Sequence, residues 1–166
     1  THPGKKLLFM GAELGQWREW DHERALDWHL LENEDNQGLQ KWLKDLNSLY
    51  RSLPALSQED FESSGFRWVD CGDSEQSVIS FLRQGSDKKS FLLAVCNFTP
   101  ISRHKYMIGV PEGGFWKEVL NSDSENYGGS GQGNLGGLEA AENPCHGMAY
   151  SLEMTIPPLG IVVFYR

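Results

Sequence analysis

The chain has 166 residues, of which 39% are hydrophobic and 23% are charged, and both proportions are ordinary for a globular protein. This composition argues against an intrinsically disordered chain, a collagen and a coiled coil. Fifteen Lys and Arg against 23 Asp and Glu give a formal net charge of −8, which repels phosphate backbones, so we expect no nucleic-acid partner. The length predicts one domain, or two units if one of them is small or incomplete.

No apolar run approaches the roughly 20 residues that a helix needs to cross a bilayer, so we expect no membrane span. Cys71, Cys96 and Cys145 are odd in number and lack C-x-x-C spacing, which argues against a disulfide framework and a zinc site and fits a cytoplasmic protein. The histidines lack the spacing of a zinc protease, so no metal and no cofactor are implied. The chain opens on Thr1 without an initiator Met or a secretory signal, so we expect it to be cut from a longer protein. The scattered histidines are His2, His22, His29, His104 and His146.

The first predicted elements are a short strand over residues 6–10, stopped by Gly11, and a loop that runs to about Trp28. Residues 37–53 are predicted to form a helix, capped by Asn36 or Asp35 and ended by Pro54. Apolar side chains recur there at steps of three and four residues, which places them on one helix face. They are Leu39, Trp42, Leu43, Leu46, Leu49, Tyr50 and Leu53.

The remainder of the chain is predicted to be an antiparallel β-sandwich that starts near residue 62 and can fold alone. Short β-rich runs are separated there by Gly, Asn, Asp, Ser and Pro at intervals of about ten residues, which is typical of a sandwich. In the run from Tyr150 to Ile156, apolar and polar residues alternate, so that strand has one buried and one wetter face. The predicted strands cover residues 66–71, 77–83, 90–97, 105–110, 115–121, 149–156 and 160–165.

Residues 131–136 match the letters of a dinucleotide-binding fingerprint, G-x-G-x-x-G. That motif works only between a strand and the N-terminus of a helix, and the flanks here are Gly-rich within a β-rich region. We therefore expect residues 128–142 to form a mobile or irregular loop that binds no nucleotide.

Residues 11–22 concentrate carboxylates, an amide, an Arg and two indoles just past the end of the first predicted strand. Sugar sites combine flat apolar platforms with carboxylates and amides that bond the hydroxyl groups. In a parallel α/β barrel the C-terminal ends of the strands carry the active-site face, so Glu13 and Gln16 would point toward substrate. The alternative is a loop whose Trp residues pack on neighbouring helices and whose charges are only solvated.

Residues 5–16, with Glu19-Trp20-Asp21 and Leu26-Asp27-Trp28, resemble 1,4-α-glucan (glycogen) branching enzymes of the α-amylase clan. Segments at residues 97–100, 118–123, 127–131 and 156–160 are similar to the C-terminal region of that family, in the same order. The resemblance implies a retaining transglycosylation that cuts an α-1,4 glucan and transfers the chain to a 6-hydroxyl. It also implies a mainly β fold, in which residues 1–58 are the last strand and helix of a truncated (β/α)8 barrel and residues 59–166 are the C-terminal sandwich.

The resemblance places the catalytic nucleophile and acid in upstream barrel segments, so it implies no catalytic residue in this chain and no activity for the chain alone. Glu13, Gln16, Trp20 and Asp21 match motif positions that line the top of the barrel, and they are the expected α-glucan-binding residues. The family usually has Phe at the position of Leu14, Gly at that of Ala12 and often Asn at that of Asp21.

Two alternatives remain open. The sandwich could be a glucan-binding or scaffold module, or the parent protein could be a debranching or trehalose-releasing relative. Exposed aromatic rings would mark a binding module, although aromatic residues in strands are commonly core residues. The candidate rings are Trp68, Phe98, Tyr106, Trp116 and Tyr127.

A chain without its barrel neighbours is also expected to expose apolar surface and to self-associate. The residues before position 37 would then be displaced, disordered or covered by another copy. The expected contact residues are Leu7, Leu8, Phe9, Trp42, Leu43 and Leu46.

Overall fold

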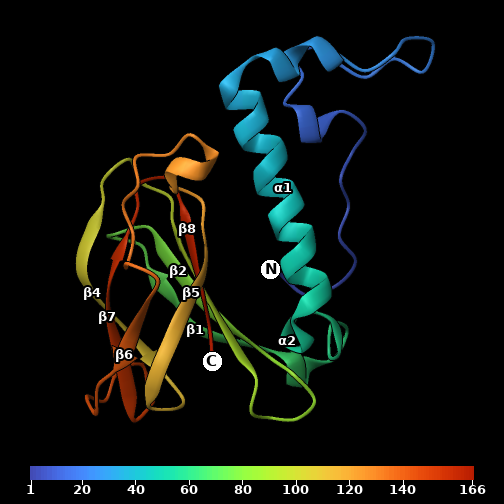
Figure 1. Cartoon of the computed structure of the whole chain (residues 1–166). Coiled ribbons are helices and arrows are strands. Elements are labelled where there is room, and N and C mark those ends of the chain that lie inside the picture. The colour runs from blue at the N-terminus through green and yellow to red at the C-terminus, as the bar shows by residue number, and fades with distance from the viewer.

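The computed structural model describes residues 1–166 and shows one long helix lying beside a β-sandwich (Figure 1). The helix α1 (Glu34–Ser52) is followed directly by the short helix α2 (Pro54–Ser57). Seven of the eight strands were predicted to within two residues at each end, which confirms the mainly β fold class and the antiparallel sandwich. The strands are β1 (Phe66–Asp73), β2 (Val78–Gln84), β3 (Phe91–Asn97), β4 (Arg103–Val110), β5 (Gly114–Asn121), β6 (Gly137–Ala140), β7 (Tyr150–Ile156) and β8 (Ile161–Tyr165).

The strands form two antiparallel layers. The larger layer has the order β1-β2-β3-β8-β5-β6, and the smaller layer pairs β4 with β7. An isolated bridge between Ala141 and Ser151 connects the segment after β6 to β7, so the two layers meet at this edge. That bridge also explains one departure from the predicted alternation in β7, because Ser151 is buried although it lies on the expected wetter face.

The six-stranded layer is buried on both of its faces. Its inner face packs against the smaller layer around Trp116, Leu152 and Phe164, none of which is exposed. Its outer face carries a second apolar cluster, which includes Leu92 and Val163 and is covered by α1 and α2. A strand that is buried on both faces is apolar without alternation, and residues 91–95 of β3 are accordingly all buried.

The helix α1 starts three residues earlier than predicted, and the predicted caps were wrong. Asn33 has an extended backbone and its side chain accepts a hydrogen bond from the Asp35 N–H at 2.9 Å, which is the geometry of an N-cap. Asn36 is already helical, and its Nδ2 instead donates to the Leu14 carbonyl at 2.7 Å. The predicted end was correct, since Leu53 before Pro54 is extended.

Residues 6–10 do not form the predicted strand. A strand exists only through hydrogen bonds to a neighbouring strand, and no strand of this chain pairs with this segment. It runs as extended backbone beside α1, on the side away from the sandwich (Figure 1).

Two of the three helix side chains that were expected to be exposed are covered instead, whereas Leu43 is half-buried beside an open hollow. Trp42 and Leu46 are half-buried and pack against the outer cluster of the six-stranded layer. The prediction failed because it treated the helix as separate from the sandwich. Leu7, Leu8 and Phe9 are exposed, as expected.

The Gly-rich segment 128–142 is irregular over residues 128–136, as predicted, but not over its whole length. It contains the strand β6, and its first part is ordered around the Asp123 carboxylate, which accepts hydrogen bonds from the backbone of Ser130 and Gln132 at 3.0 and 3.1 Å. Residues 131–136 are followed by a strand and not by a helix, as the β-rich context predicted. No helix in the structure is long and apolar enough to cross a membrane.

A first prediction concerns Gly38, where α1 crosses the turn η4 (Glu125–Tyr127). A Cβ on Gly38 would lie 2.4 Å from the Tyr127 carbonyl oxygen, so a larger residue must push the two segments apart. We expect Gly38→Ala to lower the free energy of unfolding by about 1–2 kcal/mol, because overpacking outweighs the gain of about 1 kcal/mol in helix propensity. Urea unfolding measures this change. Ser48→Ala, at an exposed position of the same helix, is the control, and equal stabilities of the two variants would contradict the prediction.

Candidate functional site

The loop that follows residues 6–10 begins with a tight turn. Gly11 and Gly15 both have left-handed backbones and flank the 3-10 turn η1 (Ala12–Leu14). A Cβ on Gly11 would lie 2.4 Å from the Cδ of Gln16, so only glycine lets the Gln16 side chain fold back over the turn. Leu14 is fully buried and accepts the hydrogen bond from Asn36 of α1 through its carbonyl. The turn is therefore fixed to the helix by both packing and hydrogen bonding.

Beyond the turn, the loop surrounds an open hollow of about 460 Å³. Gln16 and Trp20 line it, and the Trp20 ring packs edge-to-face on Phe9 with ring centroids 5.7 Å apart. The Arg18 Nε donates to the Asp27 carboxylate at 2.9 Å, and this contact joins the two ends of the loop formed by residues 18–27. The other residues of this hollow are Met10, Ala12, Arg18 and Glu19.

The structure brings together only two of the four predicted site residues. Gln16 and Trp20 share the hollow just described. Glu13 faces a second hollow against α1, and its Oε2 accepts from the Gly11 N–H at 3.1 Å. Asp21 lines neither hollow and pairs with Arg24 at 3.2 Å.

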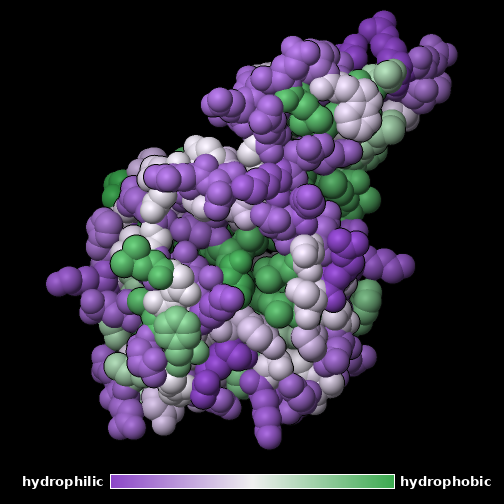
Figure 2. Space-filling model, in the orientation of Figure 1, coloured by the Kyte–Doolittle hydropathy of each residue, from purple (hydrophilic) through white to green (hydrophobic).

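Apolar side chains around this loop are exposed in unusual number. Trp17 is 94% and Leu7 is 90% exposed, which leaves almost their whole side chains in solvent. In Figure 2, hydrophobic residues are visible on the protruding upper part of the molecule and, separately, in the centre of the main body below it. Exposed apolar side chains gathered in one part of a protein are typical of an interaction site. We call these residues the apolar patch: Leu7, Leu8, Phe9, Met10, Trp17, Trp20 and Trp28.

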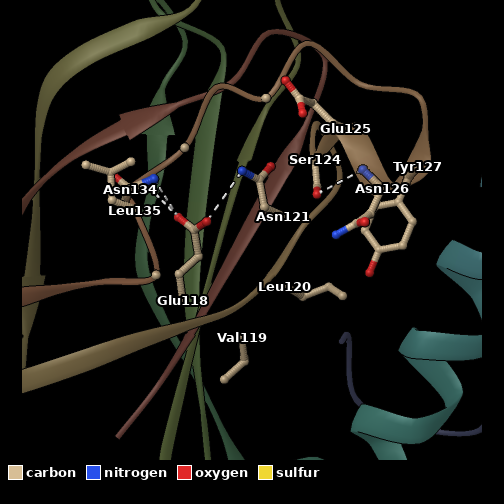
Figure 3. Close-up of a pocket in the computed structure, with 13 residues that line it drawn as sticks. Glu118, Val119, Leu120, Asn121, Ser124, Glu125, Asn126, Tyr127, Asn134 and Leu135 are labelled. Atoms are coloured by element: carbon tan, nitrogen blue, oxygen red, sulfur yellow. Dashed lines mark hydrogen bonds between the residues drawn. The ribbon is translucent and has the colours of Figure 1, made fainter.

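A further hollow, of about 540 Å³, lies on the sandwich beside the end of β5 (Figure 3). The Glu118 Oε2 accepts from the backbone and the side chain of Asn134 at 3.0 and 2.6 Å, and its Oε1 accepts from Asn121 at 3.4 Å. The Tyr127 hydroxyl donates to Asp45 of α1 at 2.8 Å, and burial followed by this hydrogen bond raises the pKa of Tyr127 to about 12. The hydrogen bonds of Glu118 therefore order the loop at Asn134, and the hydrogen bond of Tyr127 holds α1 on the sandwich.

The aromatic rings proposed as sugar platforms on the sandwich have different surroundings. Trp116 is a core residue with no exposed surface. Trp68 is half exposed and packs edge-to-face on Phe66 and Phe81, and Phe98 is 61% exposed. Tyr106 is half-buried and its hydroxyl donates to Asp73.

Sequence reasoning missed a charged cluster at the base of α1. Arg83 is completely buried in β2, and its Nη2 donates to the buried Asp60 carboxylate at 2.9 Å. The available signal was an arginine within the apolar strand β2, where an unpaired charge would be costly. No three His, Cys, Asp or Glu side chains lie together in a metal-binding arrangement, and all three cysteines are free.

Comparison with known proteins identifies the β-rich part of the chain. The family described as "Alpha amylase, C-terminal all-beta domain" matches residues 68–166. The chain belongs to this family. Its alpha-amylase C-terminal domain therefore begins within β1 and includes every later strand.

Curated relatives also match the residues that precede this alpha-amylase C-terminal domain. The chain is 56% identical to the 1,4-alpha-glucan branching enzyme GlgB of Aquifex aeolicus over 98% of its own length and 26% of the relative. Enzymes of the same name from Aromatoleum aromaticum and Synechococcus elongatus are 54% and 52% identical, again over 98% of this chain, and it covers 25% and 21% of them. The chain thus spans about a quarter of the length of these relatives, and its resemblance to branching enzymes is confirmed.

Among solved structures, a trehalulose synthase mutant in complex with Tris is 19% identical, with a TM-score of 0.44. That match covers 76% of this chain and 18% of the synthase. A MUTB mutant from crystals soaked with trehalulose is also 19% identical, with a TM-score of 0.45, over 77% of this chain and 18% of the mutant.

Proposed function

We propose that the chain is the C-terminal part of a 1,4-α-glucan branching enzyme, which cuts an α-1,4 glucan and transfers the chain to a 6-hydroxyl. In this proposal residues 1–58 complete a (β/α)8 barrel and residues 59–166 form the C-terminal β-domain. The observation that carries it is the identity of 56% to a named branching enzyme across 98% of the chain, including the loop in front of the β-domain. The three free cysteines fit a cytoplasmic setting.

The exposed state of residues 6–10 supports the barrel assignment. Residues 7–10 are apolar and exposed, and no strand pairs with this segment, so a neighbouring barrel strand would satisfy its free backbone groups and cover its side chains. Without that barrel, the apolar patch favours self-association of the chain.

The loop around Gln16 and Trp20 would then lie at the C-terminal end of a barrel strand, where barrel enzymes carry their active sites. The Trp20 face and the Phe9 ring supply an apolar surface for a sugar ring, and the Gln16 amide can both donate to and accept from hydroxyls. Glu13 and Asp21 lie outside this hollow, and we propose that they reach glucan only beside the complete barrel. The two catalytic carboxylates of a retaining enzyme are supplied by the other barrel segments.

A chimera tests the proposal. This chain replaces the matched region of the Aquifex aeolicus relative, and the purified chimera is incubated with amylose. We expect formation of α-1,6 linkages, measured by digestion with an isoamylase and chain-length analysis. New reducing ends without α-1,6 linkages would instead indicate a hydrolytic relative, and the complete loss of activity in a folded chimera would contradict the proposal.

Trp20→Ala in the same chimera is expected to raise the KM for amylose about tenfold with a smaller effect on kcat, because a stacking surface is lost. The matched control is Trp17→Ala, which removes an almost fully exposed indole from the same loop that does not line the hollow.

A further inference from the structure

Four hydrogen-bond donors from three parts of the chain converge on one buried carboxylate, that of Asp60, which is 4% exposed. From the segment before the loop, the Gly4 N–H donates to Oδ1 at 3.1 Å and the Lys6 Nζ donates to Oδ2 at 3.0 Å. From α1, the Tyr50 hydroxyl donates to Oδ2 at 3.0 Å. From β2, the Arg83 Nη2 donates to Oδ1 at 2.9 Å. We call these five residues the Asp60 cluster.

Arg83 also donates to two backbone carbonyls, one before and one after Asp60 along the chain. Its Nη1 donates to the Thr1 carbonyl and its Nε to the Gly65 carbonyl, each at 2.9 Å. The Gly4 N–H is shared between two Asp60 acceptors, since it also donates to the Asp60 backbone carbonyl, at 2.9 Å. The Lys6 ammonium lies 4.8 Å from the centroid of the Tyr50 ring, so its side chain is held from two sides.

The Asp60 carboxylate pairs with two cations of the cluster, Lys6 and Arg83. Burial by itself raises the pKa of Asp60, but the hydrogen bonds from Lys6, Arg83 and Tyr50 outweigh it, so that the pKa lies below its usual value. The hydrogen bond to Asp60 raises the pKa of Tyr50. The carboxylate is therefore ionised and the phenol protonated at neutral pH, which is the state that keeps all four donors in place.

The exposed segment in front of the candidate loop is anchored at both of its ends. At one end are the contacts of Gly4 and Lys6 with Asp60, and at the other end are the burial of Leu14 and its hydrogen bond from Asn36. Residues 7–10 between them are exposed and belong to no strand. Their position therefore depends on both anchors.

We propose that Asp60 is a positioning residue, which clasps residues 4–6 to α1 and the sandwich and thereby sets the place of Phe9, Gln16 and Trp20. This gives the β-domain a role in shaping the loop without touching a ligand. The effect on glucan binding rests on the proposed function, whereas the clasp itself does not.

Asp60→Ala is not the most informative variant, because it leaves the Arg83 guanidinium buried without its carboxylate partner. That change destabilises the whole fold and would hide an effect on residues 4–6. Lys6→Met removes one arm of the clasp and leaves the pair of Asp60 and Arg83 intact. Lys5→Met is the matched control, because Lys5 is exposed and its substitution removes the same charge one residue away. Lys6→Arg is the conservative variant that should restore the contact.

The first measurement is amide hydrogen exchange by NMR in the chain itself. We expect Lys6→Met to accelerate exchange about tenfold at Gly4 and Leu14, as the loss of the charge-assisted contact between Lys6 and both Asp60 carboxylate oxygens implies. Amides of β3 should not change, and Lys5→Met should resemble the wild type. Equal exchange in the Lys6 and Lys5 variants, or faster exchange throughout β3, would overturn the clasp.

The second measurement uses the chimera with the Aquifex aeolicus relative. Lys6→Met is expected to raise the KM for amylose about tenfold with kcat changed less than about twofold, and Lys6→Arg should restore KM. An unchanged KM in Lys6→Met would overturn the positioning role. If the chimera without substitutions is inactive, the proposed function fails, and the exchange experiment still decides whether the clasp exists.

Discussion

The chain alone, incubated with amylose, is expected to form no α-1,6 linkages and to release no reducing ends above a buffer control. A retaining mechanism needs a nucleophile and an acid held about 5–5.5 Å apart in one pocket, and losing members of such a set costs many powers of ten in rate. The resemblance to branching enzymes places both groups in barrel segments outside the matched quarter. Iodine staining and a reducing-end assay measure the two activities.

The whole Aquifex aeolicus relative is the positive control for this assay, at an equal molar concentration. Branching by the chain alone, above the buffer level and lost when the chain is heat-denatured, would show that the catalytic groups lie within these 166 residues. In that case the role proposed for the loop would have to be reassigned.

Arg83→Met is expected to have the largest effect of any single substitution on stability, lowering the free energy of unfolding by about 3–5 kcal/mol. The substitution leaves the buried Asp60 carboxylate without its closest cation and leaves the carbonyls of Thr1 and Gly65 without their donor. Urea unfolding, followed by circular dichroism, measures the change. Arg67→Met is the control, because Arg67 is an exposed arginine on the neighbouring strand β1, where about 0.5 kcal/mol is expected.

The same interaction has a defined pH dependence. Because the folded state lowers the pKa of Asp60, the cluster stabilises the protein above the unfolded value near 3.9 and loses this contribution as the pH falls through the folded value. The difference in stability between the wild type and Arg83→Met should therefore shrink below about pH 4, as Asp60 becomes protonated. A difference that stays constant down to pH 2, or that is below about 1 kcal/mol at pH 7, would contradict this account of the cluster.

Local sequence determined most of the fold. Short β-rich runs between turn residues predicted seven strands, and alternation with a period of two supported one of them, residues 150–156. The helix was predicted by its period of three and four residues, and its end by Pro54. The strand β6 was missed because four residues within a Gly-rich segment carry no periodic signal, and its pairing with β5 depends on a neighbour distant in sequence.

The family assignment was also readable from the sequence, since the motifs around residues 11–21 and 127–131 are specific in order and spacing. Tertiary structure explains one of these motifs, because Tyr127 packs edge-to-face on Trp42 and donates to Asp45, holding α1 on the sandwich. The sequence pattern identified the motif but could not state which helix it contacts.

Only the tertiary structure decided which candidate residues act together. Gln16 and Trp20 share a hollow, while Glu13 faces α1 on another side and Asp21 pairs with Arg24, because left-handed glycines turn the chain at positions 11 and 15. Residues 6–10 have the composition of a strand but lack a partner to pair with, and strand formation is a property of two segments. The contact between Asp60 and Arg83 joins residues 23 positions apart, so no local pattern could predict it, and the cost of burying an unpaired charge makes it specific to the folded chain.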